Sequence, residues 1–465
     1  MSFVFAISLF FLIVYTVLAL WHLKKVREID GLFVTIMMYA LVFGIVPSLV
    51  AGQITFNGSQ SRYIRSILDL SDTGVLALIY HYLLSFVGFW AIWFSYYGRF
   101  RKGRTRKTQS QISVAKIESE NAVLMITAWL CLLIGVLSLI LWAKAYGSIF
   151  VLIAKANSVR SGQGGVSNSL AYFKHAAKIC LLCTFMFFVL VNRQKKGLTV
   201  RKLVNGVGLI TSAVASYLYL IANDGRLTIV IFLLAILWLA VAGKKRKNVT
   251  KLIFFGCLAV VIGIILLSQM DNITYYIRYG EARRNKTQSG LLRKVVSELG
   301  FLPRGGQKSI MAAWNGKTGL TILDDLVTGI CAWLPTKMKP AGFQDVWNMN
   351  TILIFGDLSV SHGQVPCSIV TQGFYDLRFF GSILLCAMLG RFVRTIDGWH
   401  LQDGQLMQYV IKANFMEMIF RAIAYFSFYD IILGVFPLTI VMIVYKCVGA
   451  ARETILRRGK RCAVR

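Results

Sequence analysis

Long apolar runs alternate with short clusters of basic residues along the chain, which is the pattern of a protein that crosses a membrane many times. A helix needs about 20 apolar residues to cross the hydrocarbon core. Runs free of charged residues and close to this length predict spanning helices at 2–21, 31–51, 73–98, 121–143, 203–222, 227–243 and 252–269.

Further runs contain charged residues but keep the length and apolar content of a span. They lie at 170–191, about 374–392, 405–427 and 429–447. Because backbone polar groups inside lipid must be satisfied within the chain, helices are the expected form. The sequence therefore predicts an all-α integral membrane protein with about eleven transmembrane helices.

The basic connectors predict the orientation of the chain. With eleven spans they all fall on one side, and they lie at 24–27, 99–107, 193–202, 244–251 and 452–465. Lysine and arginine mark the cytoplasmic side of a membrane protein. We therefore expect the N terminus outside the cytoplasm and the C terminus inside.

Three regions follow from this topology: helices 1–8 in 1–269, a large external loop in 270–367, and helices 9–11 with a cytoplasmic tail in 368–465. The loop is rich in arginine and mixes aromatic residues with glycine and proline, so we expect it to fold and to be partly helical. Basic residues are scarce on the outer side of membrane proteins. Their presence here indicates an anionic ligand such as a lipid phosphate or diphosphate.

The net charge is +31, from 51 Lys+Arg against 20 Asp+Glu. The basic clusters sit between apolar runs, which favours membrane lipid over nucleic acid as the partner of this charge. Cys180 and Cys183 lie inside an apolar run and are interpreted as small buried side chains. No Asp-x-Asp pair occurs, so we predict neither a metal nor a cofactor.

Arginines from separate outer segments are the candidate catalytic groups, namely Arg160, Arg226 and Arg421. A guanidinium binds phosphate oxygens in pairs and stabilises a departing diphosphate. Each has a plainer interpretation: Arg160 in a mobile glycine-rich loop, Arg226 reaching lipid headgroups, and Arg421 paired with Glu417 four residues earlier.

A second set of residues is assigned to binding of the diphosphate or glycan. It comprises Arg278, Arg283, Arg284, Arg378 and Glu417. The first three directly follow the eighth span, where basic residues also serve as headgroup anchors.

His362 is the candidate general base, which would take the proton of an attacking sugar hydroxyl. It is the only histidine of the external loop and lies just before the chain re-enters the membrane. A lone loop histidine is more often an ordinary surface residue. The rival bases are Asp357, Asp376, Glu281 and Glu417.

Two segments carry a resemblance to a known family. One is Asn223-Asp-Gly-Arg226 leading into a span, and the other is Gly363-Gln-Val-Pro-Cys-Ser-Ile-Val-Thr-Gln-Gly-Phe-Tyr-Asp-Leu-Arg-Phe-Phe-Gly381. With the layout of the whole chain, they resemble the bacterial oligosaccharide repeat-unit (O-antigen) polymerases of the Wzy type.

The resemblance implies a GT-C-like glycosyltransferase of the bacterial inner membrane, with N terminus and active face in the periplasm. Such an enzyme moves a glycan from undecaprenyl diphosphate to another lipid-linked repeat unit, building the O-antigen of lipopolysaccharide or a related polysaccharide. The implied partners are a chain-length co-polymerase (Wzz type) and a flippase (Wzx type).

Other classes stay open from the sequence. An O-antigen ligase would use the same chemistry with a different acceptor. A lipid-linked oligosaccharide flippase or other transporter would also bind diphosphate. A channel or assembly scaffold would use none of this chemistry.

Overall fold

The computed structural model describes residues 1–26, 28–57, 68–98, 114–156, 159, 169–193, 199–223, 226–242, 276, 300–322, 324–331, 343, 345–356, 364–399 and 405–463. Within these residues the secondary structure is helical, with turns and one isolated antiparallel bridge between Cys367 and Phe426. The chain divides into two compact units.

Eight helical stretches of the described part are long and apolar enough to cross a membrane. They are Ser2–Val26, Gly31–Gly52, Asp72–Tyr97, Glu118–Ala145, Ser169–Asn192, Val200–Asn223, Ile369–Asp397 and Phe428–Ile455. Each coincides with a run predicted from the sequence. The protein is therefore a multi-pass, all-α membrane protein.

The other predicted runs differ in detail. Run 227–243 forms α12 (Arg226–Val241), whose 16 residues reach about 24 Å at 1.5 Å per residue. Run 405–427 forms α19 (Leu406–Ala424), which carries three charged side chains. Run 252–269 lies outside the described residues. The total of eleven spans stays a prediction.

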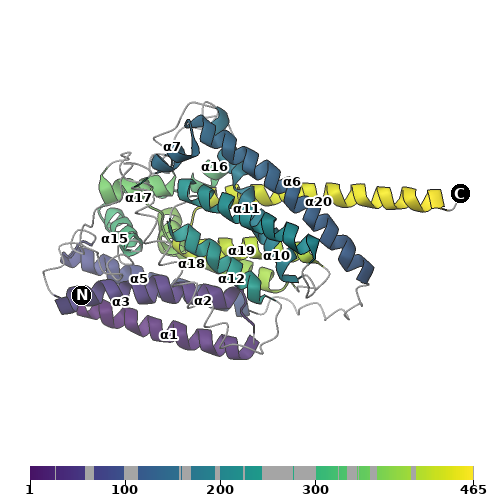
Figure 1. Cartoon of the computed structure of the whole chain (residues 1–465). Helices are drawn as coiled ribbons and strands as arrows, with labels where there is room; N and C mark the ends of the chain where they lie inside the picture. Colours follow the sequence, from purple (N-terminus) through teal and green to yellow (C-terminus); the bar gives the residue numbers. More distant parts are fainter. Residues whose placement is uncertain are drawn as a thin grey trace. The chain divides into compact units, whose positions relative to one another are not determined.

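Unit 1 comprises Met1–Arg101, Arg283–Trp399 and Met418–Ile432. Its membrane helices are α1 (Ser2–Val26), α2 (Gly31–Tyr39), the π-helical turn η1 (Ala40–Ile45), α3 (Val46–Asn57), α5 (Asp72–Tyr97) and α18 (Ile369–Asp397). Helices α2, η1 and α3 follow one another end to end and lie alongside α1 (Figure 1), and α18 packs most extensively on α5.

A buried polar network joins the ends of these helices. His22 lies 2.6 Å from the hydroxyl of Tyr97 and 2.9 Å from the carboxylate of Asp30. Asp30 also caps α2, and Asp397 accepts from the backbone N–H of Gly31 at 2.6 Å. The first N–H groups of a helix have no partner within it, so these carboxylates fix where α2 begins.

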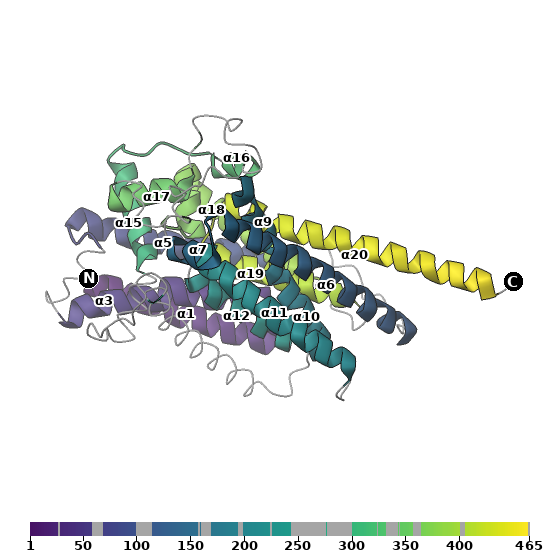
Figure 2. The same ribbon diagram turned by 45° about the horizontal axis from the view of Figure 1, so that its top comes forward.

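From residue 300 onward, the described part of the external loop belongs to unit 1 and is partly helical. It contains α15 (Phe301–Trp314), α16 (Asp324–Ile330) and α17 (Val346–Phe355), which are labelled in Figure 2. Helix α15 packs against α5 and α17. The fully buried Gln307 bonds the backbone N–H and carbonyl of Asp69 at 2.9 and 2.7 Å, and the carbonyl of Gly74 at 2.8 Å. The loop is thereby fixed to the start of α5.

Helix α18 is broken after its second turn. Leu377 and Arg378 have non-helical backbone angles, and Arg378 has a φ of 55°, which a side chain with a Cβ atom rarely adopts. The two halves cross where Gly373 meets Gly381: a Cβ on Gly373 would lie 2.5 Å from the carbonyl group of Gly381. Only glycine permits so close an approach.

Unit 2 comprises Lys102–Ala282, His400–Glu417 and Leu433–Arg465. Its helical elements before residue 282 are α6 (Val114–Ala145), α7 (Ile149–Ala154), η3 (Ser169–Tyr172), α9 (Phe173–Ala177), α10 (Ile179–Arg193), α11 (Val200–Asn223) and α12. Helix α11 packs against α10 through a face of small residues, with Ser216 hydrogen-bonded to Thr184 at 3.0 Å. From Leu433 onward, α20 (Phe428–Ala463) belongs to this unit.

Candidate functional site

Most of the residues assigned from the sequence lie outside the described part of the chain. These are Arg160, Arg278, Arg283, Arg284 and His362. Arg226 is the first residue of α12. The roles assigned to all six stay predictions. Arg378, Arg421 and Glu417 are described, and their surroundings follow.

Arg421 is a buried cation on α19. Its side chain is 9% exposed, and Nη1 lies 3.6 Å from Oδ2 of Asp430 near the start of α20. Burying one charge is costly unless an opposite charge compensates it. The ion pair with Asp430 explains how the helix keeps an arginine, and it joins α19 to the start of α20. The expected pairing of Arg421 with Glu417 stays a prediction.

The guanidinium of Arg378 is hydrogen-bonded to main-chain oxygen atoms. Its guanidinium donates to the carbonyls of Thr318, Gly319 and Phe374 and lies over the ring of Phe374. A guanidinium has five N–H donors in a rigid fork, which suits several acceptors at once. In this arrangement Arg378 ties the loop to the break in α18.

Asp325 lies in α16 and is fully buried. Its Oδ2 accepts the backbone N–H of Phe428 at 2.6 Å and the hydroxyl of Ser427 at 3.1 Å. Burial raises the pKa of Asp325 to about 6, although these hydrogen bonds favour its charged form. A loop carboxyl group therefore fixes the turn between α19 and α20.

Asp345 is the N-cap of α17. Its Oδ1 accepts the N–H of Trp347 at 2.9 Å, and its Oδ2 accepts the side-chain amide of Gln364 at 3.1 Å. Burial and, after it, the charge of Asp325 together raise the pKa of Asp345 to about 8. Each charge in such a pair disfavours ionisation of the other carboxyl group.

Asp325, Asp345, Asp430 and Arg421 form what we call the carboxyl cluster. Asp430 acts on both other carboxyl groups through its charge and pairs with Arg421. All four residues belong to unit 1. The cluster combines a carboxyl group whose pKa is raised to about 8 with a buried guanidinium, and perturbed groups of this kind gather at functional sites. The described residues contain no group arranged to hold a metal ion.

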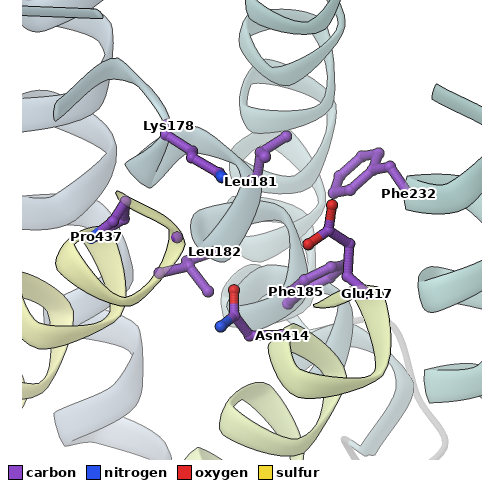
Figure 3. A pocket seen from close by; sticks show the side chains of 9 residues that line it. Lys178, Leu181, Leu182, Phe185, Phe232, Asn414, Glu417 and Pro437 are labelled. Carbon is purple, nitrogen blue, oxygen red and sulfur yellow. The ribbon is translucent and has the colours of Figure 1, made fainter. Parts of the chain in front are cut away.

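Glu417 lies in unit 2 and lines a small cavity there (Figure 3). Its side chain, that of Asn414 and that of Lys178 surround the cavity, and the other lining residues are apolar. Lys412, on the same helix, is also buried. Helix α19 thus carries several buried polar side chains along its length.

Sequence reasoning missed the carboxyl pair. Neither Asp325 nor Asp345 is among the candidate residues that the sequence pointed to. A carboxylate directly before the apolar segment 346–355 is a recognisable N-cap signal. Nothing in the sequence brings Asp345 to Asp325, because their contact depends on how the loop folds.

No known protein family, curated protein or solved structure matches the chain. The class of the protein therefore rests on its own apolar helices.

Proposed function

We propose that the protein is a membrane glycosyltransferase that polymerises undecaprenyl-diphosphate-linked repeat units into O-antigen or a related surface polysaccharide. The carboxyl cluster carries this proposal, because it pairs a base near neutral pH with a buried guanidinium beside the folded external loop. The layout of the chain and its resemblance to the Wzy-type polymerases support the same conclusion.

In the proposed reaction, the hydroxyl oxygen of the acceptor sugar bonds to the anomeric carbon of the donor glycan. The bond from that carbon to the lipid diphosphate breaks, and its electron pair leaves with the diphosphate. Asp345 takes the hydroxyl proton in its ionised form. Arg421, held by Asp430, stabilises the negative charge that grows on the diphosphate.

The proposed location, orientation and partners are those that the resemblance implied. The enzyme would lie in the bacterial inner membrane, with its N terminus and active face in the periplasm and its C terminus in the cytoplasm. Its partners would be a Wzz-type co-polymerase and a Wzx-type flippase. Arg160, Arg226, His362 and the group Arg278, Arg283 and Arg284 stay candidates for binding the diphosphate or assisting its departure.

A transporter of lipid-linked oligosaccharide is the second candidate. Buried polar side chains along a membrane helix favour it, because transporters place such groups along their substrate path. On α19 these are Lys412, Asn414 and Glu417. An O-antigen ligase shares the proposed chemistry and differs only in its acceptor.

Deletion of the gene separates these functions. Loss of a polymerase leaves surface glycan with a single repeat unit, whereas loss of a ligase or flippase leaves none. Unchanged glycan would contradict all three. Complementation then tests the site: the wild type should restore long polymer, whereas Asp345→Asn, at normal membrane abundance, should leave only the single units of the deletion strain. Asp69→Asn is the matched control, since this loop carboxylate lies outside the cluster and pairs with Lys308 at 3.5 Å.

A further inference from the structure

The last turn of α1 carries a lysine that is held by aromatic rings. The ammonium of Lys25 lies 4.7 Å from the ring centroid of Trp21, one turn earlier, and 4.7 Å from that of Tyr97 on α5. A cation this close to a ring face is attracted to it. The ring of Trp93 supports both, with its centroid 5.5 Å from that of Trp21 and 4.8 Å from that of Tyr97. We call these four residues of unit 1 the lysine–aromatic cluster.

A buried histidine fixes one ring of this cluster. His22 is fully buried, and its two ring nitrogens lie 2.6 Å from the hydroxyl of Tyr97 and 2.9 Å from the carboxylate of Asp30. Tyr97 cannot turn away without losing its contact with His22. The rings therefore restrict the otherwise flexible side chain of Lys25. A side chain that is ordered before binding loses less conformational entropy when a ligand arrives.

The charge of Lys25 is not neutralised within the described part of the chain. Its ammonium makes no ion pair or hydrogen bond with a described residue, and Lys25 is exposed. An ammonium has three N–H donors and no acceptor. Aromatic rings attract a cation but do not cancel its charge. The cluster therefore presents a positioned positive charge that an anionic oxygen can bind.

An apolar stripe leads along α1 to this charge. Ile13, Val17 and Trp21 recur every four residues and follow one side of the helix toward Lys25. They are 55%, 57% and 45% exposed, on a helix long and apolar enough to cross a membrane. From Ile13 to Trp21 the helix rises about 12 Å, and one leaflet of the hydrocarbon core is about 15 Å thick. The stripe and the lysine thus match the acyl chain and headgroup of one lipid.

We propose that the lysine–aromatic cluster binds the phosphate of an anionic phospholipid, whose acyl chains lie along Ile13, Val17 and Trp21. A zwitterionic headgroup fits less well because it brings its own cation near Lys25. The apolar stripe favours a lipid over a free phosphate ion, which would use the charge alone. The inference is independent of the proposed function.

Photo-crosslinking of the purified full-length protein in phosphatidylcholine vesicles tests this site. The vesicles contain a trace of phosphatidylglycerol or phosphatidylcholine with a diazirine in its acyl chain, and labelled peptides are mapped by mass spectrometry. We expect phosphatidylglycerol to label residues 13–21 about fivefold more than phosphatidylcholine does, the preference expected from one basic side chain at a membrane surface. Equal labelling by the two lipids would overturn the inference. Displacement of the label by millimolar inorganic phosphate would indicate a site for free anions and would also overturn it.

Variants locate the headgroup. Lys25→Gln should lower labelling by phosphatidylglycerol to the level of phosphatidylcholine, whereas Lys25→Arg keeps a cation over the rings and should retain most of the preference. Lys24→Gln is the matched control, because Lys24 is exposed and adjacent but makes no ring contact with a described residue. Trp21→Leu keeps the stripe apolar, removes one ring, and should weaken the preference as an independent variant. An undiminished preference in Lys25→Gln, or an equal loss in Lys24→Gln, would refute the site.

Discussion

The pH profile of glycan transfer distinguishes Asp345 from His362 as the base. A carboxyl group whose pKa is raised keeps its proton in acid and becomes a base only as the pH rises. With a pKa of about 8, the ionised fraction of Asp345 grows from about 1 in 100 at pH 6 to about one half at pH 8. The rate should then rise about 50-fold between these pH values.

A histidine with an ordinary pKa of about 6.5 gives a much smaller effect. Its neutral fraction rises only about fourfold over the same interval. The assay is the initial rate of polymer formation in proteoliposomes that contain the lipid-linked repeat unit, measured from pH 5.5 to pH 9. The two candidates therefore predict profiles that differ by about a factor of ten.

Substitutions complete the test. Asp345→Asn keeps a good helix cap for α17 and removes the titration, so the protein should fold while the rate and its rise are lost. Asp69→Asn is the control: hydrogen bonds from Ser71 lower the pKa of Asp69, which therefore stays ionised throughout. The assignment of Asp345 would be refuted if the rate rose only fourfold between pH 6 and pH 8, and if this rise persisted in Asp345→Asn and disappeared in His362→Gln.

Other predictions follow from single contacts and from the topology. Arg421→Ala should lower the transfer rate by about two to three powers of ten, and Arg421→Lys should restore part of it, measured against membrane abundance. Gly373→Ala should reduce the yield of folded protein in size-exclusion chromatography because its Cβ meets backbone atoms, whereas Gly449→Ala should not. A cysteine placed at Trp314, which is 52% exposed, should react with an impermeant thiol reagent from outside, and one at Lys245 should not; the reverse labelling would overturn the orientation.

The helices could be predicted from the sequence because their cause is local. Apolar runs such as 2–21 and 121–143 leave the backbone in lipid no alternative to the helix, and α1 and α6 cover them. The break in α18 could not be predicted this way. Leu377 and Arg378 resemble the start of an ordinary span, and the bend depends on the contact between Gly373 and Gly381.

The candidate site was predicted only in part, for the same physical reason. Arg421 stood out because charge inside an apolar run is rare, and the structure gives it a partner in Asp430. Asp345 did not stand out, because a carboxylate in a loop is ordinary until the fold brings the charge of Asp325 near it. Proximity of that kind arises from contacts between distant parts of the chain, which single-sequence patterns do not encode.

The contacts of Arg378 have a consequence for how this protein can change over evolutionary time. The acceptors at Thr318 and Gly319 are main-chain oxygens, so substitutions at these positions leave the atoms that bind the guanidinium in place. Glycine is required instead at the crossing of Gly373 and Gly381. Substitutions can therefore accumulate at the loop positions that contact Arg378 while the loop keeps its attachment to α18. The fold of this region then changes more slowly than its sequence.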